Sequence, residues 1–377
     1  MNKLSKWLTL LAFLSPLLGW LAERRYRQMP KLDNRKDYDQ NRWYLSLVEE
    51  TAKPSPKNLP SVSIIVPARN EAANLQQLLP SLCAVRYPGN LELIVVDDNS
   101  VDETAVIAQR HGAQVLSLDG LPQGWLGKPH ACHRAAEIAT GEWLLFTDAD
   151  TIHTQEGLAS AVCYLLENQL DGLSCHLHHK TNGLLDSLAL TTAFAGLFAG
   201  LSKQHASLNG QYILIRRDVY EASGGFAAVR NQPLEDLAFG HLLHQQGYRV
   251  PMLRGEDIAE VAMYKSNRQL WQGMMRIGAG SLRWSGIGSL MTALFITALM
   301  TPLLTWRMVR QRRLPRRWLY LTWGTAVAGA WPWSQRFDLR WRALFTPFGA
   351  LFVQLSAMWG LVNRLLGRGV RWKGRIV

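Results

Sequence analysis

Residues 91–100 read LELIVVDDNS, and residues 143–150 read WLLFTDAD. In each stretch an apolar run, typical of a buried β-strand, ends directly in clustered aspartates. Ligands of open α/β sheets bind beyond the carboxyl ends of the strands, and carboxylate oxygens are preferred ligands of hard divalent cations. The two acidic strand ends therefore predict a site for a metal ion and a nucleotide at one edge of a sheet.

Strands and helices alternate around these two stretches. Residues 62–66 read VSIIV and are closed by Pro67, and residues 71–83 have the apolar periodicity of a helix. The pattern repeats, with strands expected at 62–66, 91–96, 115–118 and 143–146 and helices at 71–83, 102–111 and 130–139. Such alternation predicts an α/β fold with a mostly parallel central sheet.

The first 27 residues predict a membrane anchor. Leu4 to Ala22 form an apolar run about long enough to span a bilayer, and residues 23–27, ERRYR, follow at once. A signal peptide has a shorter apolar core and a cleavage site of small residues, so we expect the run to be retained, with the chain after it in the cytoplasm. Residues 28–60 are polar and contain four prolines, which predicts a linker before a catalytic domain at 61–262.

Positive charge is concentrated in the last third of the chain. The formal net charge is +12, but residues 1–260 carry 23 basic and 28 acidic groups, whereas residues 261–377 carry 18 basic groups and one acidic group. The basic groups lie among apolar, tryptophan-rich stretches, as in segments that face anionic lipid headgroups. The acidic remainder argues against nucleic acid as a partner. We therefore expect 263–377 to hold amphipathic and membrane-embedded helices with a basic tail, and the apolar stretches are 290–306, 318–333 and 343–366.

Two further features bear on location. Residues 184–201 are apolar and rich in Gly and Ala but contain Asp186, which predicts an interfacial amphipathic helix within the catalytic domain. The four cysteines form no CxxC pair, which fits a reducing compartment. We expect an integral protein of a bacterial-type inner membrane, with its catalytic domain in the cytoplasm and the lipid bilayer as a partner.

Asp148 and Asp150 are the candidate metal ligands. They are two residues apart, so in extended backbone their side chains point to the same side, and one or both can coordinate a divalent cation. Such a cation neutralises the charge of a leaving diphosphate. Lys128, in the loop GWLGKP at 124–129, offers a further positive charge to a diphosphate.

The other candidates follow the first two strands. Asp97 and Asp98 are suited to accept hydrogen bonds from a uracil N–H and from sugar hydroxyls, although Ser100 or Asp102 at the same place also fits a helix cap. The turn PARNE at 67–71 offers backbone groups and the carboxylate of Glu71 to a base or ribose.

Together these segments resemble the family 2 glycosyltransferases of the GT-A fold, over about residues 62–276. The motifs that carry the resemblance are PARNE at 67–71, DDNS at 97–100, GKPHA at 127–131, TDAD at 147–150, GGF at 224–226 and LED at 234–236. The resemblance implies that the donor nucleotide is held by Pro67, Arg69, Glu71, Asp97, Asp98, Lys128 and Asp148. It also implies that Asp150, with Asp148, binds Mn²⁺ or Mg²⁺, and that Asp236, beside Glu235, is the general base.

That chemistry is consistent with the residue types. An acceptor hydroxyl that attacks an anomeric carbon must lose its proton, and a positioned carboxylate can take it. A single displacement inverts the anomeric centre. The local alternative for Glu235 and Asp236 is a pair of charges in the first turn of a helix, favoured by the helix dipole.

The order of GWLGKPHA, NGQY at 209–212, GGF, LED and WKGR at 372–375 is similar to membrane glycosyltransferases of carotenoid and hopanoid pathways. Processive polysaccharide synthases carry a QxxRW motif, which Gln272, Arg276 and Arg283-Trp284 match only in pieces. The expected function is thus inverting, metal-dependent transfer of one sugar from UDP-glucose to a hydroxyl of a membrane lipid such as a carotenoid or related polyprenoid. The alternatives are a processive polysaccharide or polyprenyl-phosphate sugar transferase and a noncatalytic membrane protein that binds a nucleotide sugar.

Overall fold

The computed structural model describes residues 3–32, 59–200, 207–281, 286–369, 371–372 and 375–376. The chain divides into two units, which are described separately. The sheet unit comprises Pro30–His179 and Gln204–Val261, and the helical unit comprises Met1–Met29, Lys180–Lys203 and Ala262–Val377. Most of the predicted linker, and Arg283-Trp284, lie outside the described residues.

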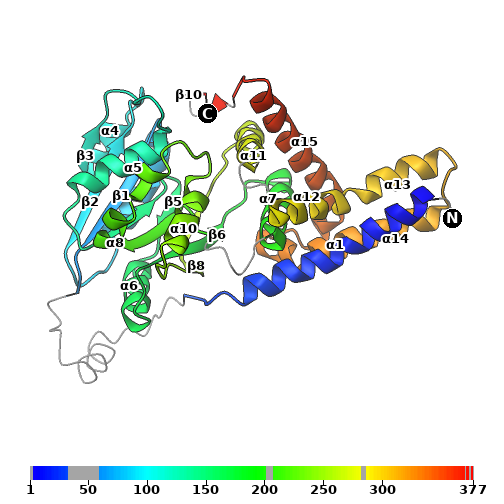
Figure 1. Cartoon of the computed structure of the whole chain (residues 1–377), viewed down its shortest axis with the longest axis horizontal. Coiled ribbons are helices and arrows are strands. Elements are labelled where there is room, and N and C mark those ends of the chain that lie inside the picture. Colours follow the sequence, from blue (N-terminus) through cyan, green and yellow to red (C-terminus); the bar gives the residue numbers. More distant parts are fainter. Residues whose placement is uncertain are drawn as a thin grey trace. The chain divides into compact units, whose positions relative to one another are not determined.

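The sheet unit contains an eight-stranded sheet in the order β3-β2-β1-β4-β7-β6-β8-β5 (Figure 1). Its strands are β1 Val62–Ala68, β2 Leu91–Asp97, β3 Gln114–Ser117, β4 Trp143–Thr147, β5 Thr151–His153, β6 Gly172–His179, β7 Tyr212–Arg216 and β8 Met252–Val261. The first four in this order are mutually parallel, and so are β6 and β8. β7 runs antiparallel to both β4 and β6, and β5 runs antiparallel to β8. The predicted α/β class with a mostly parallel sheet is confirmed.

Helices connect and cover these strands. They are α3 Ala72–Cys83, α4 Thr104–Arg110, α5 Gly127–Ile138, α6 Gly157–Glu167, α8 Arg217–Ala222, α9 Gly225–Ala228 and α10 Glu235–Gln245. One buried cluster joins Phe146 of β4 and Ile213 of β7 to Ala135 of α5, Phe226 of α9 and Phe239 of α10. β4 is buried along its whole length because it is a central strand covered on its faces, which explains its continuous apolar sequence.

The register of the central strands determines where the site lies. β1 pairs with β2 on one side and with β4 on the other, and Ala68 at the end of β1 lies opposite Asp97 at the end of β2. The carboxyl ends of all three strands therefore meet at one edge of the sheet, as the sequence predicted.

The helical unit consists of α1 Lys3–Arg27, α7 Leu184–Gly200, α11 Asn267–Ser281, α12 Ile287–Leu299, α13 Thr301–Arg310, α14 Arg316–Ser334 and α15 Thr346–Leu365. Short 3₁₀ turns at Gln335–Phe337 and Arg340–Phe345 follow α14, and a small hairpin is formed by β9 Arg371–Trp372 and β10 Arg375–Ile376. α7 contacts α1, α12, α14 and α15, and most of its side chains are buried. The helix predicted at 184–201 thus groups with the helical unit, and its position at a membrane interface stays a prediction.

Small residues bring the helices of this unit into close contact. A Cβ added to Gly19 of α1 would lie 1.9 Å from the carbonyl oxygen of Gly329 of α14, and one added to Gly200 of α7 would lie 2.4 Å from the oxygen of Gly288. Ser15 donates a hydrogen bond to the carbonyl of Thr325 over 2.9 Å. Close backbone approach at small residues is typical of helices that pack within membranes.

Two helical segments of the described residues are long and apolar enough to cross a membrane, judged by length and composition. They are Ile287–Arg310, which contains α12 and α13, and Arg340–Leu365, which contains α15. The predicted apolar stretch at 290–306 falls within the first of them, and all but the last residue of the stretch at 343–366 falls within the second. The stretch at 318–333 and the N-terminal run are helical, in α14 and α1, and their passage through a membrane stays a prediction.

Candidate active site

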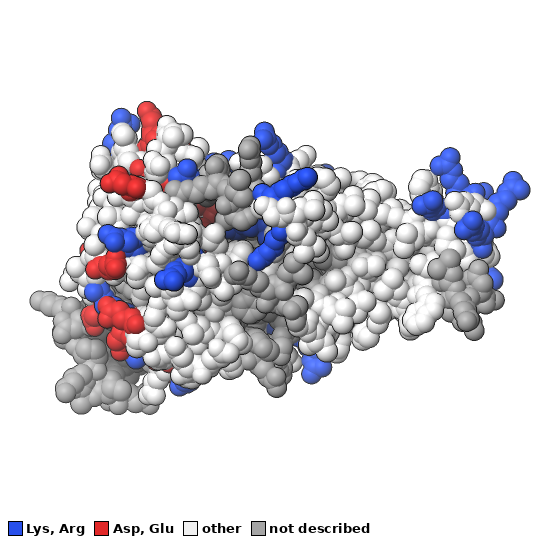
Figure 2. All heavy atoms as spheres, turned by 45° about the horizontal axis from the view of Figure 1, so that its top comes forward, with Lys and Arg blue, Asp and Glu red and all other residues white. Residues whose placement is uncertain are grey.

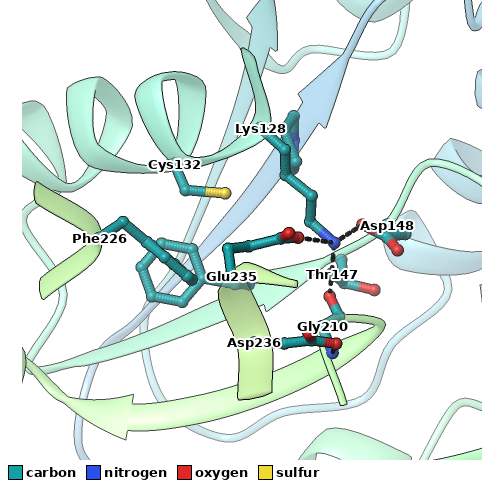
Figure 3. Close-up of a pocket in the computed structure, with 10 residues that line it drawn as sticks. Lys128, Cys132, Thr147, Asp148, Gly210, Phe226, Glu235 and Asp236 are labelled. Atoms are coloured by element: carbon teal, nitrogen blue, oxygen red, sulfur yellow. Dashed lines mark hydrogen bonds and ion pairs between the residues drawn. The ribbon is translucent and has the colours of Figure 1, made fainter. Parts of the chain in front are cut away.

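A pocket lies at the carboxyl end of β4, in the sheet unit (Figure 3). Its lining residues come from β1, β4, the start of α5, α9, α10 and the segment before β7: Pro67, Lys128, Cys132, Phe146, Thr147, Asp148, Gly210, Phe226, Glu235 and Asp236. Five of the predicted site residues are among them, namely Pro67, Lys128, Asp148, Glu235 and Asp236.

Lys128 lies at the centre of the charged groups of this pocket. Its Nζ is 2.6 Å from Oδ1 of Asp148 and 3.4 Å from Oε1 of Glu235, and it donates a hydrogen bond to the carbonyl oxygen of Gly210 over 3.3 Å. Burial on its own lowers the pKa of Lys128, but the carboxylates of Asp148 and Glu235 outweigh that effect and raise it above its ordinary value. The two carboxylates therefore favour the protonated, positively charged form of Lys128.

Asp236 is fixed by two backbone N–H groups. Its Oδ2 accepts a hydrogen bond from the N–H of Gly210 over 2.9 Å, and its Oδ1 accepts one from the N–H of Leu237 over 2.8 Å. α10 begins at Glu235, so Asp236 lies in its first turn, as the local alternative expected. A carboxylate oxygen has more than one acceptor position, so Asp236 keeps the capacity to accept a further proton.

Gly210 connects the lysine to the aspartate. Its carbonyl accepts from Lys128 while its N–H donates to Asp236. An added Cβ would lie 2.8 Å from Nζ of Lys128 and 3.3 Å from Oδ2 of Asp236. A side chain at this position would therefore require the end of the Lys128 side chain to move away from the peptide.

The turns after β1 and β2 hold each other through polar contacts. Arg69 donates hydrogen bonds to the carbonyls of Asp98 and Asn99, over 2.5 and 3.1 Å, and the N–H of Asn70 donates to Oγ of Ser100 over 2.9 Å. Asn70 and Asn99 have φ angles of 53° and 55°, a left-handed conformation that Asn tolerates better than most residues. Arg69, one of the predicted site residues, thus holds the backbone that follows β2.

The four carboxylates near these turns differ in their surroundings. Asp97 accepts a hydrogen bond from the N–H of Ser100, and Asp102 accepts one from the N–H of Thr104, so both cap local backbone. Asp98 and Glu71 are buried, with 4% and 6% of their surfaces exposed. Capping of local backbone therefore accounts for the contact of Asp97, whereas Asp102 also accepts a hydrogen bond over 3.1 Å from the N–H of Ala72 at the start of α3. Glu71 and Asp98 lie at the same strand ends, as predicted.

The carboxylates of Asp148 and Asp150 are chemically suited to a divalent cation. Asp148 lines the pocket, whereas Asp150 follows it at the turn into β5 and is not among the lining residues. Among the residues that the structure describes, no group of three or more His, Cys, Asp or Glu side chains is arranged to hold a metal ion. The protein would thus supply only part of a coordination shell, with the rest left to a ligand and water.

Several residues of the pocket were not predicted as site residues. Thr147 donates a hydrogen bond to the carbonyl of Gln211 over 3.0 Å and lies 3.0 Å from Nε2 of His153, which ties β4 to the segment before β7. Burial raises the pKa of the Cys132 thiol, which favours the protonated thiol over the nucleophilic thiolate. The motif NGQY at 209–212 was the sequence signal for Gly210, but nothing in it told which groups its peptide contacts.

Comparison with known proteins identifies this part of the chain. The family model for Glycosyl transferase family 2 matches residues 63–237, which run from β1 to the first turn of α10 and include every residue that lines the pocket. They are a family 2 glycosyltransferase domain. The family predicted from the sequence motifs is therefore confirmed.

Relatives of this glycosyltransferase domain extend the comparison. A 4,4'-diaponeurosporenoate glycosyltransferase of Staphylococcus aureus (strain MRSA252) is 28% identical over 242 residues, which cover 60% of this chain. The chain spans 64% of the length of that relative. A mannosyltransferase from Pyrobaculum calidifontis, solved in complex with GDP-Man and Mn²⁺, has a TM-score of 0.55 at 20% identity and covers 97% of this chain and 98% of its own. This second likeness shows a shared fold.

Proposed function

We propose that this family 2 glycosyltransferase transfers one sugar from a nucleotide sugar, UDP-glucose, to a hydroxyl of a membrane lipid, with inversion. The observation that carries the proposal is the convergence of Lys128, Asp148, Glu235 and Asp236 on one pocket beyond β4. The pocket contains a group suited to each of the two charge changes of the reaction, a lysine cation for the diphosphate and a carboxylate for the proton. A diphosphate leaves with negative charge, and an acceptor hydroxyl loses a proton.

The donor half of the reaction is assigned to the residues at the ends of β1, β2 and β4. Glu71, Asp97 and Asp98 bind the base and ribose, with Pro67 and Arg69 shaping the turn between them. Lys128 meets the diphosphate, and its position in the first turn of α5 adds the positive end of a helix dipole. Asp148 and Asp150 would hold Mn²⁺ or Mg²⁺, which when bound stabilises the negative charge on the diphosphate.

The acceptor half is assigned to Asp236. The acceptor O–H gives its proton to the Asp236 carboxylate as its oxygen bonds to the anomeric carbon, and the bond from that carbon to the diphosphate oxygen breaks. Both oxygens of Asp236 are oriented by backbone N–H groups, which supports this role because a general base must be held in position. Glu235, the residue before Asp236, forms an ion pair with Lys128 and so keeps the lysine side chain oriented.

The proposed acceptor is a carotenoid or related polyprenoid. The name of the S. aureus relative, a 4,4'-diaponeurosporenoate glycosyltransferase, supports a carotenoid as the acceptor class. The apolar, glycine-packed helical unit supports an acceptor that arrives from a membrane. We place the protein in a bacterial-type inner membrane with the sheet unit in the cytoplasm.

Comparison of lipid extracts by mass spectrometry tests the acceptor. Cells with the gene are expected to contain hexosylated carotenoid or polyprenoid that is missing from cells without it. A long polysaccharide product points instead to a processive synthase, and a sugar on polyprenyl phosphate points to the other enzymatic alternative. Identical lipids and glycans in both strains, together with donor binding by the purified chain, point to a noncatalytic sensor.

A further inference from the structure

A basic groove lies in the helical unit, where the C-terminal ends of α1 and α14 come together. Its volume is about 810 Å³, and its lining includes Trp20, Arg24 and Arg27 of α1 together with Trp331 of α14 and Arg336 just after it. This size is within the usual range for sites that hold small molecules. The proposed sugar transfer uses none of these residues.

The groove exists because α1 and α14 run parallel. Ser15 contacts Thr325 and Gly19 contacts Gly329, at successive turns of both helices. One turn further along α1, Glu23 accepts hydrogen bonds from Arg336, which lies just after α14. The small residues allow close packing along the seam. Beyond Gly19 and Gly329 larger side chains follow, and Trp20, Arg24 and Trp331 line the groove there.

The groove is lined by more arginines than acidic residues. Arg24, Arg27 and Arg336 line it together with one acidic residue, Glu23, which leaves a net charge of +2. Glu23 is already engaged, because Arg336 and Arg27 both form ion pairs with it, at 2.6 and 2.5 Å. For Arg24, by contrast, the described residues provide a ring contact with Trp20, at 5.6 Å, and no ion pair.

Helix dipoles reduce this positive charge without cancelling it. The C-terminal end of a helix carries roughly half a negative elementary charge, so the two helix ends contribute about −1 in total. The carbonyl of Pro332 near the end of α14 already accepts a hydrogen bond from Arg336 over 3.1 Å. The groove therefore stays positive, and its guanidinium groups have the planar geometry that binds phosphate through two hydrogen bonds.

The aromatic residues at the groove indicate which anion it takes. Trp20 and Trp331 are exposed over 58% and 48% of their surfaces, although both are large and apolar. Exposed tryptophans beside arginines are typical of the level of lipid headgroups, where the ring contacts acyl chains and the cation contacts phosphate. A soluble phosphate has no apolar part that would cover these rings.

We propose that this groove binds the phosphate of an anionic lipid headgroup. The lipid acts as a structural ligand of the helical unit. Its phosphate is held by Arg24 and Arg27, with Arg336 completing the positive wall, and its acyl chains cover Trp20 and Trp331. The proposal is independent of sugar transfer.

Native mass spectrometry of the full chain in detergent, titrated with phosphatidylglycerol, tests this site. The double variant Arg24→Gln/Arg27→Gln should bind the lipid about tenfold more weakly, because it removes two charges from the groove. The double variant Arg316→Gln/Arg317→Gln removes the same charge at the other end of α14, from two exposed side chains, and should bind like the wild type. Equal weakening in both variants, or none in the first, contradicts the proposal.

Further titrations distinguish an anionic lipid from free phosphate, and a measurement of thermal unfolding checks that the variants are folded. Arg24→Lys/Arg27→Lys should restore most of the binding, and the glutamine variant should keep the thermal unfolding midpoint of the delipidated wild type. Phosphatidylcholine should bind more weakly, and inorganic phosphate should fail to displace phosphatidylglycerol. Equal binding of the two lipids, or displacement by inorganic phosphate at comparable concentration, overturns the assignment to an anionic lipid.

Discussion

At the scale of single residues, the peptide of Gly210 links the cation of the pocket to its proposed base. The carbonyl faces Lys128 and the N–H faces Asp236, so one rigid group fixes both distances. An oriented carboxylate loses less freedom when the acceptor hydroxyl arrives, which lowers the barrier to transfer. We therefore propose that Gly210 is a positioning residue, which acts through Asp236.

Gly210→Ala is expected to lower kcat about 10- to 100-fold, because the new Cβ displaces Lys128 or Asp236 and misplacement of a reacting group by about 1 Å costs this much. Steady-state kinetics with saturating donor measure the change. The matched control is Gly324→Ala, since a Cβ at Gly324 meets no atom within 4 Å. A Gly210→Ala enzyme as active as that control contradicts the positioning role.

The sequence predicted part of this arrangement. Strand-end position alone indicated that Asp98 and Asp148 would lie at one edge of the sheet, because parallel strands share their polarity. It could not predict the contacts of Gly210 or the engagement of Lys128 with Asp148 and Glu235, since these depend on where the segment before β7 and the start of α10 pack in three dimensions.

At the scale of elements, the strands up to β4 and the strand that carries His176, His178 and His179, β6, could be predicted, whereas β5, β7 and β8 could not. β1, β2 and β4 are largely apolar runs, and β1, β2 and β3 are each followed by a helix, so periodicity alone indicates these strands. β7 is antiparallel to both of its neighbours, so it does not follow the pattern of parallel strands joined by helices. The separation of α7 from the sheet unit also depends on contacts between distant segments.

His153 joins two of these elements. In β5, it lies 3.0 Å from the hydroxyl of Thr147 at the end of β4, and its ring centre is 5.7 Å from that of Tyr212 in β7. Burial lowers the pKa of His153 to about 4. The unfolded chain binds a proton to this residue below about pH 6.5, whereas the folded chain does so only below about pH 4.

Stability should therefore fall as the pH is lowered from about 6.5 to 4, since protons bind preferentially to the unfolded chain in this window. His153 should account for about 2 kcal/mol at pH 5, and buried His179, whose pKa is also lowered to about 4, acts in the same direction. His153→Gln should flatten the dependence of the thermal unfolding midpoint between pH 7 and pH 5. An unchanged pH dependence in this variant contradicts the assignment of this loss of stability to His153.

The seam between α1 and α14 supports a second prediction at this scale. Gly19→Ile places side-chain atoms against the backbone of Gly329 and should destabilise the helical unit by about 1–3 kcal/mol. Thermal unfolding in detergent measures the loss. Leu17→Ile is the control, because Leu17 is exposed over 58% of its surface, and a Gly19→Ile chain as stable as this control contradicts the packing.

At the scale of the whole molecule, the two units differ in charge and in chemistry. Asp338 is the one acidic residue after position 260, whereas acidic and basic side chains mix within the sheet unit. Figure 2 shows basic side chains without acidic neighbours around the end of α13 and the start of α14. The proposed reaction requires a polar unit that binds the donor and a basic, apolar unit that contacts lipid, and the two units differ in this way.

The mode of membrane attachment follows from that division. If the apolar helices are embedded, the chain should stay with the membrane fraction after washes with alkaline carbonate and with 1 M salt, and it should leave only with detergent. Salt at this concentration screens charges beyond about 3 Å, so attachment through arginines alone would be lost. Release by either wash contradicts an integral protein.

The most direct test of the central claim is hexose transfer by the purified full chain in detergent. Labelled UDP-glucose, Mn²⁺ and extracted membrane lipid are the substrates, and the wild type is compared with Asp236→Asn and with Asp218→Asn, whose side chain is 69% exposed and lies outside the pocket. The account predicts that Asp218→Asn transfers hexose to lipid like the wild type, whereas Asp236→Asn binds the donor but transfers at least about 100-fold more slowly. Transfer by Asp236→Asn at the wild-type rate would contradict it.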